Sequence, residues 1–258
     1  MAKVIDKTGF ESEVKPILDA WVNTVGDKLD TDLTQYFKLP GDKGIGSGFS
    51  VSFKDFKQLI NTVGTQFFKA RFGIQEDKFA LVLWGVGNAQ NGTLTQVSTN
   101  YLILDHQDFT FDNKTIPNLP EMRNSVAKLP IILAHSRLES WRKLTTLKSG
   151  IFKINLINEN TLKLKETKTL RGYNYSLIDF FGIFIGIESF PEEDITIRID
   201  FCYLNYDSNS MVDPTQGFFD LLFSTVVSNG TAGKKIQNAF YDAGAPCPPL
   251  CNGGGGGD

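Results

Sequence analysis

The sequence predicts an α+β protein, with a mainly antiparallel sheet of about five strands, helices packed on one face and a flexible C-terminal tail. Short segments with alternating or continuous apolar residues, such as 79–86 and 195–203, predict the strands. Longer segments with apolar residues at helical spacing lie between them. A run of five glycines near the end predicts the tail, because it offers no side chain to a core.

Apolar side chains recur every three to four residues in several segments, and cap residues precede two of them. Ser52 is followed by Asp55 at the third helical position, which is typical of an N-cap. Asp213-Pro214 is a second favourable helix start, with Asp as the cap and Pro as the first residue. The segments that we expect to be helical are 10–29, 52–72, 118–147 with a break or kink at Pro130, 175–189, 214–228 and 232–242.

Strands are expected where apolar residues alternate with polar ones or fill a short run. The clearest case is a hairpin, in which Phe152, Ile154 and Leu156 alternate with polar residues before a turn at 158–160. The predicted strands are 79–86, 94–104, 152–156, 162–165 and 195–203.

The predicted organisation is a single α+β domain over residues 1–245, followed by a Cys/Pro/Gly-rich tail over residues 246–258. A chain of 258 residues is long enough to bury a sizeable core, and 21 phenylalanines supply bulky side chains for it. The net charge of −3 argues against a nucleic-acid-binding protein.

No transmembrane segment is predicted, because the most apolar run, 177–187, is shorter than the roughly 20 residues that a membrane-spanning helix needs. The N-terminal residues lack the apolar region of a signal peptide. We therefore expect a soluble protein of bacterial type, either cytoplasmic or exported by a route without a classical signal peptide.

Charge is distributed unevenly along the chain. Residues 119–171 hold 11 Lys or Arg against 4 Asp or Glu, whereas residues 172–213 hold 8 acidic residues against one basic residue. Because the two blocks cancel, we expect them to form neighbouring faces that attract each other across the fold.

Asp105, His106 and Asp108 follow a predicted strand and form the candidate metal site. Alternation along the strand would put His106 and Asp108 on one side, within reach of one divalent ion. A metal site needs at least a third protein ligand, and no second cluster in the sequence supplies one.

Four basic residues form a candidate anion-binding surface on the predicted hairpin. Lys153, Lys163, Lys165 and Arg171 are expected on its solvent face, where they would meet a phosphate or an acidic partner. Exposed lysines also prevent strand edges from aggregating, which explains the same residues without a ligand.

The candidate attachment tail contains Cys247 and Cys251, which flank Pro248, Pro249 and Leu250. The three-residue spacing differs from the two-residue spacing of redox and zinc motifs, so the pair suits a small disulfide ring or a link to another chain.

Catalytic motifs are missing or incomplete, and no cofactor is expected. These patterns favour a non-catalytic protein that acts through a protein partner or through self-association, with the tail as its attachment element. Two alternatives stay open: a metal-dependent hydrolase using Asp105, His106 and Asp108, and a membrane-active or pore-forming protein that rearranges its Phe-rich segments.

Overall fold

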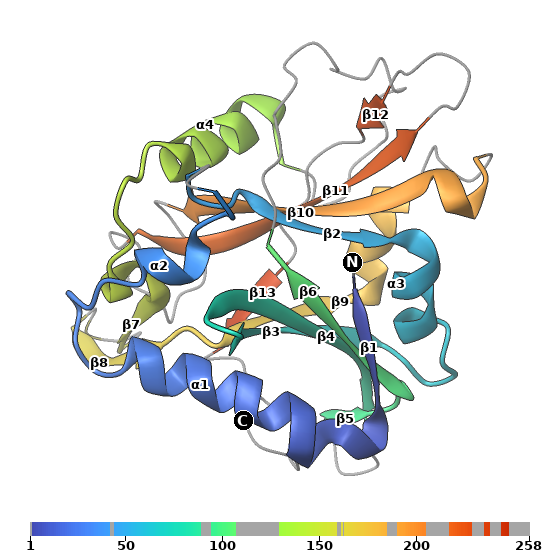
Figure 1. The fold of residues 1–258 in the computed structure, drawn as a ribbon, viewed down its shortest axis with the longest axis horizontal. Coiled ribbons are helices and arrows are strands. Elements are labelled where there is room, and N and C mark those ends of the chain that lie inside the picture. Colours follow the sequence, from blue (N-terminus) through green and yellow to red (C-terminus); the bar gives the residue numbers. More distant parts are fainter. Residues whose placement is uncertain are drawn as a thin grey trace.

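Two antiparallel sheets face each other across an aromatic core, and one helix covers the outer side of each sheet (Figure 1). This computed structural model describes residues 2–41, 44–88, 94–106, 129–158, 161, 163–184, 190–204, 217–228, 235–237 and 244–247. The predicted α+β class with antiparallel sheets is confirmed.

The first sheet has the strand order β1-β6-β4-β3-β9-β13, and β5 also pairs with β4. Every pairing in it is antiparallel. Its strands are β1 (Lys3–Asp6), β3 (Phe67–Gln75), β4 (Lys78–Asn88), β5 (Leu94–Gln96), β6 (Asn100–Asp105), β9 (Gly172–Ser176) and β13 (Gly244–Cys247).

The second sheet has the order β12-β11-β10-β2, and a separate hairpin pairs β7 with β8. In the second sheet the long strands β10 and β11 pair along ten residues, from Ile195 opposite Val227 to Leu204 opposite Phe218. The strands of these two sheets are β2 (Gly48–Ser52), β10 (Ile195–Leu204), β11 (Phe218–Ser228), β12 (Lys235–Gln237), β7 (Lys153–Ile157) and β8 (Leu164–Thr169).

Alternation along each strand assigns its side chains to two different environments. In β4, Phe79, Leu81 and Leu83 belong to the core between the sheets, whereas Val82 and Trp84 belong to a second apolar cluster on the outer face of the first sheet. The inner side chains of the second sheet are Phe49, Val51, Ile197, Ile199, Phe201, Phe219, Leu221 and Phe223.

Helix α1 (Lys15–Val25) covers the outer face of the first sheet, where Ile17 and Leu18 pack on β4 and β6. It approaches β3 closely, since a Cβ at Gly73 would lie 2.3 Å from the Ile17 side chain. Helix α4 (Ile131–Arg142) covers the outer face of the second sheet. The remaining α-helices in the described part of the chain are α2 (Thr34–Phe37), α3 (Phe53–Ile60) and α5 (Leu177–Phe180).

Several predicted elements are present at the expected places. The first helix begins with a π-helical turn at Phe10–Val14 and ends at Gly26, inside the predicted range 10–29. The Ser52 hydroxyl accepts a hydrogen bond from the Asp55 amide at 3.0 Å, which is the predicted N-cap of α3. The hairpin and the strand at 195–203 are also confirmed.

Four helix predictions are wrong in part. The described residues of the expected helix 232–242 form strand β12. The expected helix 52–72 ends at Ile60, and its last residues belong to β3. Most of the expected helix 214–228 is β11. The expected helix 175–189 is replaced by the end of β9, the single turn α5 and a 3-10 turn at Phe181–Phe184. Residues 185–189 lie outside the described part of the chain.

Phe79 lies in the core between the sheets, whereas Phe181 is exposed. We expect Phe79→Ala to lower the free energy of unfolding by about 3–5 kcal/mol, because its buried ring contacts seven other aromatic rings and its loss leaves a cavity. Phe181, which lies in the expected helix 175–189, is 49% exposed, so Phe181→Ala should cost less than about 1 kcal/mol. Urea denaturation of the two variants measures the difference, and equal losses would contradict the assigned core.

Candidate functional site

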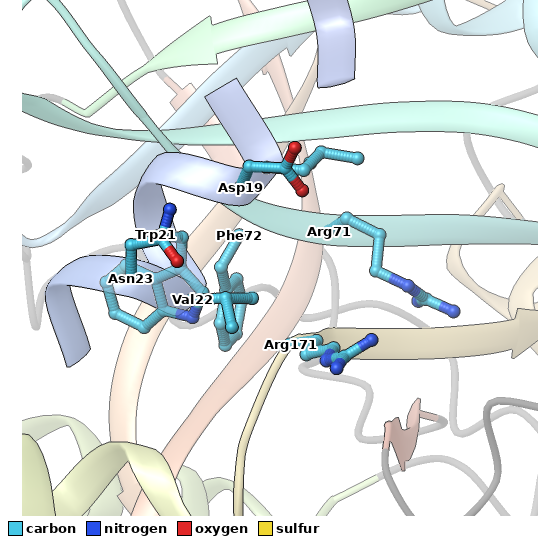
Figure 2. Close-up of a pocket in the computed structure, with 8 residues that line it drawn as sticks. Asp19, Trp21, Val22, Asn23, Arg71, Phe72 and Arg171 are labelled. Atoms are coloured by element: carbon cyan, nitrogen blue, oxygen red, sulfur yellow. The ribbon is translucent and has the colours of Figure 1, made fainter. Parts of the chain in front are cut away.

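A pocket of about 270 Å³ opens between α1, the strand β3 and Arg171, the residue that precedes β9 (Figure 2). Buried Trp21 and Phe72 contribute apolar surface to it, and exposed Asp19 and Asn23 line it from α1. Two arginines complete the polar part of the lining. The residues that line the pocket are Leu18, Asp19, Trp21, Val22, Asn23, Arg71, Phe72 and Arg171.

Arg71 is a buried cation, with only 2% of its surface exposed. One terminal nitrogen of its guanidinium donates to the Tyr173 carbonyl at 2.8 Å, and the other donates to Asn174 Oδ1 at 2.8 Å. The group also lies 5.8 Å from the centre of the Trp84 ring, and the Lys69 ammonium lies 5.7 Å from the same ring. The orientation of Arg71 is therefore fixed by β9 on one side and by an aromatic face on the other.

Arg171 immediately precedes β9 and is half-buried. Its carbonyl accepts a hydrogen bond from the Phe72 amide at 2.9 Å, which holds its backbone against β3. The next residue, Gly172, has φ +135°, and a Cβ there would lie 2.0 Å from the Ala70 carbonyl oxygen. A glycine is therefore required for this close approach, which brings the backbone of Arg171 beside that of the strand carrying Arg71.

Arg171 is among the candidate residues that the sequence predicts, whereas Arg71 is not. The signal for Arg71 was present: Lys69 and Arg71 alternate with the apolar residues Phe68, Ala70 and Phe72. This is the pattern of a strand with two different faces, but it was concealed by the prediction of a helix over 52–72.

A second polar cluster lies beneath α4 on the outer face of the second sheet. Arg198 donates two hydrogen bonds to Asp200 Oδ1, one of them from Nε at 2.8 Å. Asp220 of β11 lies 4.0 Å from the Arg137 guanidinium of α4. Asp200 and Asp220 are both 1% exposed, so α4 and the sheet enclose these charges almost completely.

The electrostatics of Asp200 follow from this enclosure. Burial raises the pKa of the Asp200 carboxyl, and the nearby guanidinium groups of Arg198 and Arg142 oppose the shift. Arg142 belongs to the basic block of the sequence and Asp200 to the acidic block. At this position the two blocks do meet across the fold.

His106 of the predicted metal site is buried, with 8% of its surface exposed. Its Nδ1 lies 3.0 Å from the Phe79 carbonyl oxygen and its Nε2 lies 3.2 Å from the Lys38 carbonyl oxygen. A metal ion would have to displace one of these contacts. Asp108 lies outside the described residues, so the site of Asp105, His106 and Asp108 stays a prediction. Within the part of the chain that is described, no three His, Cys, Asp or Glu side chains form a group that could hold a metal ion.

The four basic residues of the predicted anion surface do not share one environment. Lys153 is only 3% exposed, instead of lying on the solvent face, and its ammonium donates to the Gly26 carbonyl. Burial lowers the pKa of Lys153. Lys163 and Lys165 are exposed near and on β8, whereas Arg171 lines the pocket. Anion binding by Lys163 and Lys165 stays a prediction.

The predicted tail begins inside a strand. Gly244, Ala245, Pro246 and Cys247 form β13, in which Cys247 is opposite Gly172 of β9. The predicted boundary between residues 245 and 246 therefore falls within this strand. Cys251 lies outside the described residues.

Comparisons with protein-family models, with curated proteins and with solved structures gave no match for this chain. None of the helices in the described ranges has the length and apolarity that crossing a bilayer requires.

The buried pair beneath α4 leads to a prediction about stability. We expect Asp200→Ala to lower the free energy of unfolding by about 3–5 kcal/mol, because it leaves the Arg198 guanidinium buried without its carboxylate. Replacing both residues, as R198M with D200L, should recover most of that loss, since no buried charge of the pair then remains. Chemical denaturation of the three proteins measures both effects. A double variant as unstable as Asp200→Ala would contradict this account.

Proposed function

We propose that the protein acts through contacts with other protein chains, as a self-assembling subunit whose attachment element begins at Gly244. The observation that supports this proposal is the position of β13. β13 is an edge strand of the first sheet. Among the described residues it pairs with one strand, β9.

A strand in this position is suited to exchange between copies of the chain. β13 has four residues, so few backbone hydrogen bonds hold it to its own sheet. Pro246 lies within it, and proline is tolerated at a sheet edge because it has no N–H for a further strand. Local opening of such a short edge strand requires far less free energy than global unfolding.

Exchange would reproduce the same contacts between two molecules. If β13 of one copy pairs with β9 of a second copy, each pairing from Gly244–Tyr175 to Cys247–Gly172 is recreated across the interface. Because identical contacts replace one another, the free energy of assembly depends mainly on the linker and on concentration. Addition of a strand to a sheet edge is a recurrent mode of protein recognition.

The segment beyond β13 would strengthen such a contact. Cys247 lies in the exchanged strand and Cys251 follows four residues later, so a disulfide could join two copies in an oxidising environment. The metal-dependent hydrolase and the membrane-active protein stay alternatives without a supporting observation in the described residues.

Two truncations test this proposal. Deleting residues 244–258 removes β13 and should leave a folded monomer, whereas deleting residues 249–258 spares β13 and should preserve the oligomer of the full chain. Multi-angle light scattering gives the mass, and circular dichroism checks that each truncated chain is folded.

Three results would contradict the proposal. The first is a full chain that stays monomeric at all concentrations. The second is an oligomer that survives deletion of residues 244–258. The third is a chain that unfolds when β13 is removed, because the strand would then be needed for folding rather than for exchange.

A further inference from the structure

We infer that the pocket between α1 and β3 binds a small organic anion, with a carboxylate or phosphate group held by Arg71 and Arg171 and an apolar body against α1. Its volume of about 270 Å³ is slightly below the roughly 300–1,000 Å³ of typical ligand pockets. A ligand with one ring is therefore the appropriate size.

The charge of the lining favours an anion. The charged residues that line the pocket are two arginines and one aspartate, Asp19. Lys69 is 5% exposed and shares the Trp84 ring with Arg71, so a third cation lies close to the pocket. Cations that are shielded from water act on a ligand more strongly than exposed ones, because the surrounding dielectric screens them less.

The Arg71 side chain is positioned before any ligand arrives. Arg71 is fixed by its hydrogen bonds to Tyr173 and Asn174, which leaves little conformational entropy to lose on binding. In Figure 2 the Arg71 and Arg171 side chains extend toward the same side of the view, from β3 and from the residue before β9, whose backbone is hydrogen-bonded to β3. The planar Arg171 guanidinium is suited to carboxylate and phosphate because it can donate two parallel hydrogen bonds. Arg71, whose terminal nitrogens donate to Tyr173 and Asn174, contributes its positive charge.

The remaining lining residues define the rest of the ligand. Leu18, Val22 and Phe72 present apolar surface, which suits a ring or a short aliphatic chain. The Trp21 indole N–H already donates to the Leu170 carbonyl at 2.9 Å, so Trp21 offers the pocket its ring rather than a donor. The pocket therefore combines a cationic end with an apolar wall.

Isothermal titration calorimetry of the full chain tests the inference with four probes. Benzoate and phenyl phosphate carry a ring and an anionic group, inorganic phosphate carries only the anion, and benzyl alcohol carries only the ring. We expect saturable one-to-one binding of benzoate or phenyl phosphate, and the tighter of the two identifies the anionic group. Inorganic phosphate and benzyl alcohol should each bind at least about tenfold more weakly, since each lacks one half of the interaction.

Variants assign the binding to this pocket. Arg171→Gln removes one guanidinium from the half-buried side of the pocket and should weaken binding of the preferred probe at least about tenfold. Lys54→Gln is the matched control: it removes one positive charge from the exposed surface of α3, which does not line the pocket, and should leave binding unchanged. Val22→Phe fills the apolar part of the pocket and should weaken the binding of benzoate and of phenyl phosphate.

Several outcomes would overturn the inference. The first is that neither benzoate nor phenyl phosphate binds to the full chain. The second is that the Arg171→Gln variant binds the preferred probe as tightly as the unmodified chain does. The third is that Lys54→Gln weakens binding as much as Arg171→Gln does. If inorganic phosphate bound as tightly as phenyl phosphate, the inferred contact between the pocket and the apolar body of the ligand would be wrong. None of these results depends on β13, so the inference and the proposed self-assembly fail or succeed separately.

Discussion

The aromatic packing between the two sheets is the constraint on which the rest of the structure depends. Phe79 stands at its centre: its ring stacks on Phe37 at 4.3 Å and meets rings from both sheets, among them Phe72 at 5.4 Å and Phe219 at 5.8 Å. Large rings fill this layer only if the strands keep their registers, because a slip of one residue would turn every ring outward. The aromatic layer therefore fixes the two sheets relative to each other.

Once the phenylalanines occupy the inner faces, the alternate residues must face outward. On β3 these residues include Lys69 and Arg71, and on β10 they include Arg198 and Asp200. Helices α1 and α4 then cover the same faces, so charges that begin on the outside of a sheet become buried. Each buried charge needs compensation, which Arg71 obtains from carbonyl, amide and aromatic groups and Arg198 obtains from Asp200.

The sequence predicts the fold class, the first helix, the hairpin and β10, because in those segments the apolar period matches only one structure. It fails for β3 and β11, which lie between an inner aromatic face and a covered outer face. β11 has apolar residues on both sides, so the apolar period alone does not distinguish it from a buried helix, and Asp213-Pro214 then favoured the wrong choice. On β3 the alternation of Lys69 and Arg71 with apolar residues was concealed by the helix predicted over 52–72. The pocket could not be predicted for a further reason: Arg71 and Arg171 are 100 residues apart, and the pairing of β3 with β9 brings their backbones together.

Each of the two covering helices has a buried tryptophan whose indole N–H donates to a backbone carbonyl, but the helices differ in the surface that they cover beyond it. α1 packs Ile17 and Leu18 against an apolar cluster that extends over β4 and β6, so the hydrophobic effect holds it. α4 is anchored at its C-terminal end by Trp141, whose indole N–H donates to the Gly46 carbonyl at 3.0 Å. Apart from Trp141, α4 buries Ala134 and Leu138 against the sheet, and it covers charged groups that are about as well satisfied in water. Its attachment therefore strengthens toward Trp141, and the charged cluster beneath it contributes more to the choice of helix position than to the stability of the fold.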